Sequence, residues 1–219
     1  MPMSTVSPSP IAPSRTLDPA TDLVLVGLGN PGAEYAGTRH NIGWACLETF
    51  AGRAGIRLTR RRWKARVGCG EVAGRRIWLL EPQTYMNLSG RSVLEATRDL
   101  GLGPGSVWVL HDEIDLGLCR LRIRRGGSAA GHNGVRSIIA ALHSDEFVRF
   151  RVGVGRPPKP GSEAGIRHVL GRFTSAEAAV LPTVLEGVAS AVELALTMGL
   201  ERAMERYNRP GSLGCDELP

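Results

Sequence analysis

The order of elements along the chain predicts an α/β fold, in which a single globular domain has a central β-sheet flanked by helices. Short apolar runs bounded by glycines, which are typical of buried strands, alternate with segments of helical spacing. The 219 residues suffice for one well-buried domain, and hydrophobic residues make up 42% of them. No window approaches the ~18 consecutive apolar residues of a membrane helix, so we expect a soluble protein.

The first half of this domain is expected to contain a strand, a helix, a hairpin and a second helix. Residues 22–28 form a short apolar run, and residues 41–55 carry apolar side chains at helical spacing. Residues 64–72 and 75–81 read as strands paired about a tight turn at Ala73-Gly74. The next helix, over residues 87–100, is stopped by the sequence GLGPG.

The second half is expected to contain three more strands and two helical regions. Residues 106–115 form a buried strand that runs into an acidic loop, and residues 119–123 form another. A glycine-rich loop opens onto a helix over residues 134–143, and residues 147–155 alternate as a half-exposed strand. A capping box from Thr174 to Glu177 starts the C-terminal helical region, where we expect Pro182 to separate a first turn from the main helix.

The packed domain is predicted to span residues 22–208. Residues 1–21 are rich in proline and serine and are expected to form a disordered tail, and residues 209–219 a flexible C-terminal tail. The N-terminus has no apolar segment after a basic start, so we expect no secretory signal. A serine-rich tail leaves a transit peptide as an alternative, but a single arginine, Arg15, and the acidic Asp18 argue against it, and we expect a cytoplasmic protein. Cys46, Cys69, Cys119 and Cys215 form no C-x-x-C pair. They indicate neither a zinc site nor a disulfide framework, and we expect reduced structural thiols.

The charge distribution indicates an anionic partner. The formal net charge is +6 and the sequence pI is about 9.7. Basic residues gather over residues 53–66, 120–125 and 149–159. Each cluster alone could be a solvated face, but three clusters bordering glycine-rich loops favour a phosphate-rich ligand.

The stretch VLVGLGNPG contains Gly27, Gly29 and Gly32 in the G-x-G-x-x-G spacing of dinucleotide-binding turns. Such a turn requires a helix directly at the glycines and an acidic residue about 20 positions further on. Here the next helix begins near Asn41, and the later region is basic. We therefore reject a nicotinamide-dependent dehydrogenase and expect the glycines to turn the chain sharply and place Asn30 at a pocket floor.

Asn30, His40 and Asp112 follow the carboxyl ends of two predicted strands, where ligands bind in open α/β sheets. A histidine suits removal of a proton from water at neutral pH, and an aspartate would fix its tautomer. His40 could instead be a simple solvated side chain, and HDEID, which contains Asp112, could be an exposed turn or a divalent-ion site. No G-x-S-x-G elbow exists, which favours direct attack by water. Asn87 and Asn133 lie at apparent helix starts. They could stabilise an oxyanion or simply act as N-caps.

These pieces together resemble the bacterial-type peptidyl-tRNA hydrolase family. The matching segments run in family order from about Asp22 to Asn208 and include VGLGNPGAEYAGTRHNIG, EPQTYMNLSG, HDEIDLGLCRLRIRRGG, GHNGVRSII, FVRFRVGVGRP and VLGRF. The resemblance implies a monomer with a mixed, twisted central sheet, no metal and no cofactor. It implies hydrolysis of the ester between a peptide and tRNA, which returns stranded tRNA to translation.

The resemblance also implies roles for individual residues. His40 would be the general base and Asp112 its orienting partner, with Asn133 positioning the substrate and stabilising the tetrahedral intermediate. The peptide and the 3′-terminal adenosine would be bound by Asn30, Tyr35, Met86 and Asn87. Arg124 and Arg149 would clamp the 5′ phosphate of the acceptor stem.

Two departures and one alternative accompany this interpretation. Ser128 to Ala130 stand where many relatives have more glycine. Arg124 replaces a family lysine, so a planar guanidinium with several donors stands in place of a compact ammonium group. The alternative is a non-catalytic RNA-binding relative of the intron-splicing type. Such a protein has no need to keep the catalytic set of histidine, aspartate and three asparagines together.

Overall fold

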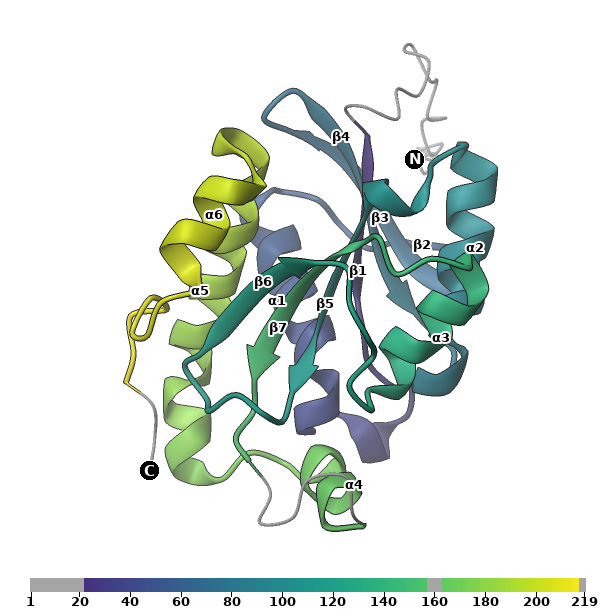
Figure 1. Cartoon of the computed structure of the whole chain (residues 1–219). Helices are drawn as coiled ribbons and strands as arrows, with labels where there is room; N and C mark the ends of the chain where they lie inside the picture. Colours follow the sequence, from purple (N-terminus) through teal and green to yellow (C-terminus); the bar gives the residue numbers. More distant parts are fainter. Residues whose placement is uncertain (1–21, 157–162, 217–219) are drawn as a thin grey trace, which may run out of the picture.

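The computed structural model describes residues 22–156 and 163–216 (Figure 1). The predicted tail over residues 1–21 and Lys159 of the third basic cluster lie outside the described residues. A seven-stranded mixed sheet forms the centre, in the order β2-β3-β4-β1-β5-β7-β6. The strands are β1 (Leu23–Gly27), β2 (Arg60–Arg62), β3 (Ala65–Val72), β4 (Arg75–Pro82), β5 (Val107–Glu113), β6 (Leu121–Arg125) and β7 (Val148–Gly153).

The sheet is parallel in its middle and antiparallel at both edges. Strands β4, β1, β5 and β7 run parallel, whereas β2, β3 and β4 pair antiparallel, as do β6 and β7. The predicted β3–β4 hairpin is confirmed. Its turn residues Ala73 and Gly74 both have positive φ, 53° and 74°, the geometry that two-residue hairpin turns prefer.

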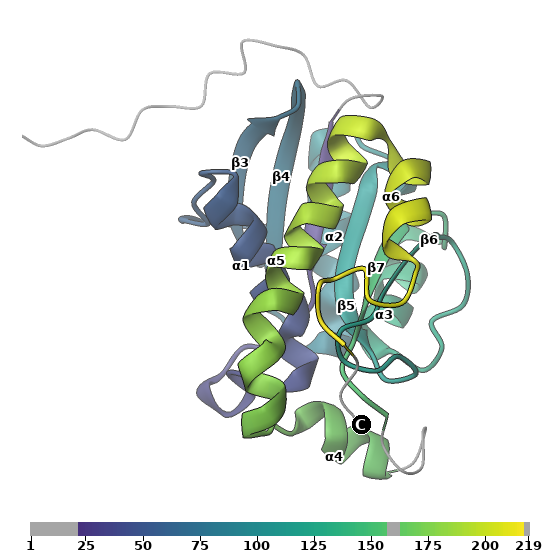
Figure 2. The same cartoon turned by 90° about the vertical axis from the view of Figure 1, so that its left-hand side faces the viewer.

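Helices cover both faces of the sheet (Figures 1 and 2). Helices α1, α5 and α6 pack on one face, and α2 and α3 pack together on the other. The helices are α1 (Ile42–Arg53), α2 (Ser89–Leu100), α3 (Asn133–Leu142), α4 (Glu163–Leu170), α5 (Ser175–Met198) and α6 (Leu200–Tyr207). Short 3₁₀ turns are η1 (Ala33–Tyr35), η2 (Arg39–Asn41), η3 (Met86–Leu88) and η4 (Pro104–Ser106).

Each face of the sheet has its own apolar core. Side chains alternate along β1, so that Leu23 and Leu25 enter the core under α1 and α5, while Val24 and Val26 enter the core under α2. Every residue of β1 is buried, as expected for a central parallel strand covered on both faces. The strand is therefore a fixed base for the loop that follows it.

The prediction of a half-exposed strand over residues 147–155 was wrong. Strand β7 lies between β5 and β6, and all of its residues except Arg151 are buried. The alternation arises because Arg149 and Arg151 occupy every second position. Arg149 is nevertheless only 2% exposed, so its charge is held inside the protein.

The predicted break at Pro182 was also wrong. The capping box of Thr174 and Glu177 is present, and α5 continues through Pro182 to Met198. A proline inside a helix leaves the carbonyl four residues earlier without its N–H donor. Pro182 lies on the exposed side of α5, where water can satisfy that carbonyl. Its cost is offset by a buried face that runs from Val184 to Leu196.

The packed domain extends beyond the predicted boundary at Asn208. Helix α6 was not predicted, and after it Leu213 is 4% exposed and packs against Gly187 of α5. Cys119 and Cys215 form a disulfide across 96 positions of sequence, which corrects the expectation that all four thiols are reduced. Spacing alone concealed this pair because the fold, and not the local sequence, brings the two cysteines together.

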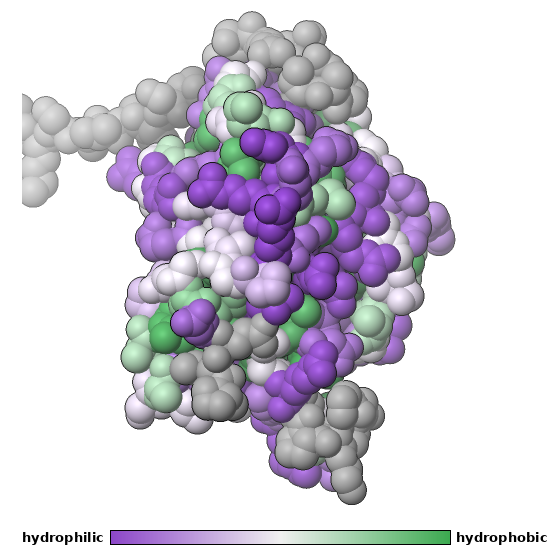
Figure 3. All heavy atoms as spheres, turned by 60° about the vertical axis from the view of Figure 1, so that its left-hand side comes forward, coloured by the Kyte–Doolittle hydropathy of each residue, from purple (hydrophilic) through white to green (hydrophobic). Residues whose placement is uncertain are grey.

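Helix α5 is long and apolar enough to span a membrane by length and composition alone. Its buried residues belong to the core that it shares with α1 and the sheet, which is the ordinary role of an apolar helix in a globular domain. On the face that Figure 3 shows, hydrophilic side chains interrupt the apolar ones, which form only small patches. This helix is therefore weak support for a membrane protein.

Candidate active site

The loop after β1 carries Asn30 and leads to His40. Gly27 lies so close to α1 that a Cβ atom there would be 2.5 Å from the carbonyl oxygen of Gly43. After Gly32 the chain makes the turns η1 and η2, and α1 begins only at Ile42. No α-helix begins at the glycines to receive a pyrophosphate, so the expected distance between the glycines and the next α-helix is confirmed. The glycines instead permit close packing of α1 on the sheet.

Asn30 is buried in this loop and is hydrogen-bonded to two other residues. The side chain of Asn41 accepts a hydrogen bond from the Asn30 backbone N–H at 2.9 Å and donates one to its carbonyl at 3.0 Å. The Asn30 Oδ1 atom accepts a hydrogen bond from the backbone N–H of Met86 at 2.7 Å. Asn30 thus joins the loop after β1 to η3, and its position at a pocket floor stays a prediction.

His40 and Asp112 meet at the edge that parallel β1 and β5 share. Nδ1 of His40 lies 2.9 Å from Oδ1 of Asp112 and 3.0 Å from Oδ2. An ionised carboxylate only accepts hydrogen bonds, so Nδ1 carries the proton and Nε2 has a free lone pair. Among the described residues, none is hydrogen-bonded to Nε2. The predicted pairing is confirmed.

The turn η2 holds His40 rigidly through its neighbours. The backbone N–H of Arg39 donates to the carbonyl of Gly171 at 3.0 Å. The guanidinium of Arg39 binds the carboxylate of Glu177 at 2.6 Å and the carbonyl of Arg172 at 2.6 Å. These contacts tie the start of α5 to η2 and so anchor the backbone that carries His40, while Asp112 orients its ring.

His132 is a third member of the cluster, which the sequence interpretation missed. Its Nδ1 accepts hydrogen bonds from the backbone N–H groups of Gly134 and Val135 at 3.1 and 3.2 Å, and so caps α3. Nδ1 must therefore be unprotonated, and Nε2–H donates to Oδ1 of Asp112 at 2.8 Å. Asp112 thus receives hydrogen bonds from His40 and His132. The signal in the sequence is GHNG, in which the adjacent Asn133 also fits the common pattern of an N-cap.

The electrostatics of the site favour an ionised Asp112 and a more basic His40. Burial alone would raise the pKa of Asp112, but the charges and hydrogen bonds of His40 and His132 lower it strongly. Burial alone would lower the pKa of His40, but Asp112 raises it above 6.5. His111 is buried next to His132, and burial lowers its pKa well below the usual value. His111 is therefore neutral at pH 7.

The ligand atoms of His40, Asp112 and His132 all lie within 4.8 Å of one another, a spacing that could hold a metal ion. The hydrogen bonds already account for this proximity, because both imidazoles donate a hydrogen bond to the carboxylate. A cation would have to displace both protons and break the cap of α3. The arrangement fits an acid–base cluster better than a metal centre.

The other predicted substrate residues lie in η1, in η3 and at the start of α3. Met86 is buried against the start of α3, where its Sδ lies close to Gly134. Asn87 is exposed, and Tyr35 is half-buried in η1. Asn133 is exposed at the first position of α3, and its Oδ1 accepts a hydrogen bond from Arg136. Neither asparagine caps its helix, so the N-cap alternative was wrong for both.

The structure places Arg124 and Arg149 opposite each other in the β6–β7 register, but in different environments. Arg124 is exposed and lies over Gly127. Arg149 is buried, and its guanidinium donates to the carbonyls of Gly127 and Ser128. Burial, with the nearby charge of Arg124, lowers the pKa of Arg149 to about 10, so it remains charged at pH 7. Arg149 supports the loop, whereas Arg124 is free to meet a ligand.

An α/β sheet that carries a carboxylate-oriented imidazole with a free nitrogen at the edge of its parallel strands is typical of a hydrolase. The family model for peptidyl-tRNA hydrolase matches residues 24–213. This chain belongs to the peptidyl-tRNA hydrolase family.

Individual relatives agree in sequence and in fold. The peptidyl-tRNA hydrolase of Chloroflexus aggregans is 47% identical over 186 residues, 84% of this chain and 98% of that protein. The one from Syntrophotalea carbinolica is 45% identical over 185 residues, 84% of this chain and 96% of that protein. The crystal structure of the Acinetobacter baumannii peptidyl-tRNA hydrolase superposes with a TM-score of 0.79 at 34% identity, covering 89% of this chain and 95% of that one.

Proposed function

We propose that this protein hydrolyses the ester bond between a peptide and the 3′ end of tRNA, releasing free tRNA for translation in the cytoplasm. The observation that carries the proposal is the pair of His40 and Asp112 at the shared edge of β1 and β5, in which Nε2 of His40 is free to accept a proton. Membership of the family supports the substrate class.

His40 acts as the general base. Its Nε2 takes a proton from water while the water oxygen attacks the ester carbonyl carbon, and Asp112 stabilises the imidazolium that forms. The tetrahedral intermediate then collapses with cleavage of the ester C–O bond. The 3′ oxygen of the terminal ribose leaves with the proton from His40, and the new carboxyl group releases its own proton to solvent, so the products are a peptide carboxylate and tRNA.

Asn133 stabilises the negative charge that develops on the carbonyl oxygen. Its Oδ1 is occupied by Arg136, which leaves the side-chain NH₂ group to donate. It also stands at the positive end of α3, a favourable position for an oxyanion. Asn30, Tyr35, Met86 and Asn87 bind the peptide and the terminal adenosine, and exposed Arg124 contacts the 5′ phosphate of the acceptor stem. The protein acts as a monomer.

A hydrolysis assay tests the proposal directly. N-acetyl-aminoacyl-tRNA and the same tRNA carrying an unblocked amino acid are incubated with the protein, with and without a chelator. Selective release of tRNA from the blocked substrate, unchanged by the chelator, is the expected result. The RNA-binding alternative predicts that both tRNAs are bound and neither is cleaved, and loss of cleavage with the chelator would indicate a metal at His40, Asp112 and His132.

A further inference from the structure

Ion pairing divides the first basic cluster, over residues 53–66, into two groups. Four of its basic residues bind carboxylates. Arg53 binds those of Glu186 and Glu193, and Arg62 binds that of Asp99. Lys64 binds that of Glu95, and Arg66 binds those of Glu48 and Glu81. Within the described part of the chain, no carboxylate pairs with Arg57, Arg60 or Arg61. These three arginines carry the charge of the cluster that is left for a ligand.

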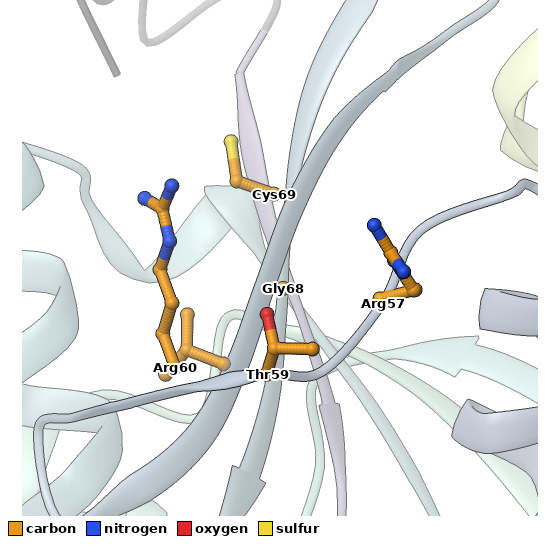
Figure 4. A pocket seen from close by; sticks show the side chains of 6 residues that line it. Arg57, Thr59, Arg60, Gly68 and Cys69 are labelled. Carbon is orange, nitrogen blue, oxygen red and sulfur yellow. The ribbon is translucent and has the colours of Figure 1, made fainter. Parts of the chain in front are cut away.

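Arg57 and Arg60 line one cavity, whereas Arg61 does not. The cavity has a volume of about 260 Å³, and its other lining residues are Thr59, Val67, Gly68 and Cys69. Figure 4 shows Arg57 and Arg60 on either side of the strand that carries Gly68, with Thr59 between them and Cys69 on the side of Arg60. A Cβ atom on Gly68 would lie 2.9 Å from the carbonyl oxygen of Arg57, so only glycine lets this segment approach β3 so closely.

The cavity lies where the edge of the sheet is open. Pairing between β2 and β3 ends at Arg60 and Val67, so the rest of β3 has no partner strand on this side among the described residues. An arginine on an edge strand can act simply by blocking pairing with another sheet, and Arg60 and Arg61 both lie in β2 and fit that role. Arg57 lies outside β2, so blocking of strand pairing does not explain its presence. Two unpaired guanidinium groups and a hydroxyl form the donor set that a phosphate group prefers.

This edge is far from the predicted contact with the 5′ phosphate. Five strand spacings of about 4.8 Å separate β3 from β6, which carries Arg124, or roughly 24 Å in a flat sheet. One phosphate cannot reach both places.

We propose that Arg57, Thr59 and Arg60 form a second anion site that binds a phosphate group, separate from the catalytic site. The phosphate belongs either to an RNA backbone or to a small phosphate-bearing molecule. The inference does not depend on the assignment of His40, because neither the cavity nor its residues contact that cluster. Phosphate contacts of this kind strengthen RNA binding without reading sequence.

Cys69 provides a reporter inside the cavity. Cys46 is fully buried and Cys119 is bonded to Cys215, which leaves Cys69 as the partly exposed free thiol of the chain. Iodoacetamide labelling of Cys69 is followed by mass spectrometry at mildly alkaline pH, with deacylated tRNA, with inorganic phosphate and without ligand. The variants are R57Q/R60Q and, as a matched control on the same edge, R61Q. The ratio of rates with and without ligand is compared within each variant, because the arginines also change thiol reactivity.

At a ligand concentration about ten times Kd, mass action predicts labelling about tenfold slower in the wild type and in R61Q. Removal of both guanidinium groups is expected to weaken binding at least about tenfold, so that R57Q/R60Q is slowed only about twofold. Protection by tRNA alone identifies an RNA backbone, and protection by inorganic phosphate identifies a small ligand. No protection by either, or equal protection in R57Q/R60Q, would overturn the proposal. The His40→Ala variant must show the wild-type ratio whether or not the protein hydrolyses peptidyl-tRNA.

Discussion

Nδ1 of His40 lies 2.9 Å from Oδ1 of Asp112, and the same carboxylate oxygen accepts a hydrogen bond from His132 at 2.8 Å. One buried charge therefore orients two imidazoles. His132 uses its other ring nitrogen to cap α3, which bears Asn133. The base and the proposed oxyanion donor are thus placed relative to each other by a single carboxylate.

Replacement of Asp112 by asparagine is expected to lower kcat/KM by about 10²-fold, less than loss of His40, because water and substrate positioning remain. It should also change the pH profile. Asp112 raises the pKa of His40 above 6.5, so kcat/KM of the wild type should increase with pH through a midpoint above that value. Removal of the negative charge should move this midpoint down. A midpoint unchanged by Asp112→Asn would mean that another group titrates in the profile.

His132→Ala and His132→Asn separate two functions of one side chain. Both variants remove the hydrogen bond to Asp112, but asparagine can still cap α3. We expect His132→Ala to lose about 1 kcal/mol of unfolding free energy relative to His132→Asn, with reduced hydrolysis in both. Denaturant unfolding and steady-state kinetics measure the two effects. Wild-type kinetics in His132→Asn would show that His132 serves α3 alone.

Arg124→Ala and Arg149→Ala should differ in kind. Loss of exposed Arg124 should weaken tRNA binding and reduce its salt slope by about one phosphate contact, while the free energy of unfolding stays within about 0.5 kcal/mol of wild type. Loss of buried Arg149 should destabilise the fold by about 1–3 kcal/mol, because the carbonyls of Gly127 and Ser128 lose their donors. Binding titrations at several salt concentrations and urea unfolding test this. An unchanged salt slope for Arg124→Ala would place the phosphate contact elsewhere.

The Cys119–Cys215 disulfide should stabilise the fold without serving catalysis. Cys215→Ser, or reduction of the wild type, is expected to remove about 2–4 kcal/mol of unfolding free energy and leave kcat unchanged. Cys69→Ser is the matched control and should match wild type in both. The contrary outcome has two parts. Cys215→Ser would unfold at the wild-type denaturant concentration, and the unreduced wild-type protein would show four titratable thiols after unfolding. Together these results would show that the bond does not form in solution.

Local patterns predicted those parts of the molecule that local physics determines. Strand β1, helix α1 and the β3–β4 hairpin follow from apolar runs, helical spacing and a two-residue turn, and the meeting of His40 with Asp112 follows from parallel neighbouring strands. The burial of Arg149 could not be predicted from the sequence, because it depends on which strands flank β7. The same holds for the disulfide, whose cysteines stand 96 positions apart. His132 was visible in GHNG, but a helix cap made by a histidine is unusual, and the adjacent asparagine fitted the common pattern better.

The most direct test of the central claim is to compare wild type with His40→Ala in hydrolysis of N-acetyl-aminoacyl-tRNA and, in parallel, in tRNA binding. His143→Ala, at the exposed end of α3, is the control. Loss of the general base should slow turnover by about 10²–10⁴-fold, with tRNA affinity and His143→Ala both at the wild-type level. Wild-type turnover by His40→Ala would contradict the assignment of the base and, with it, the role given to Asp112.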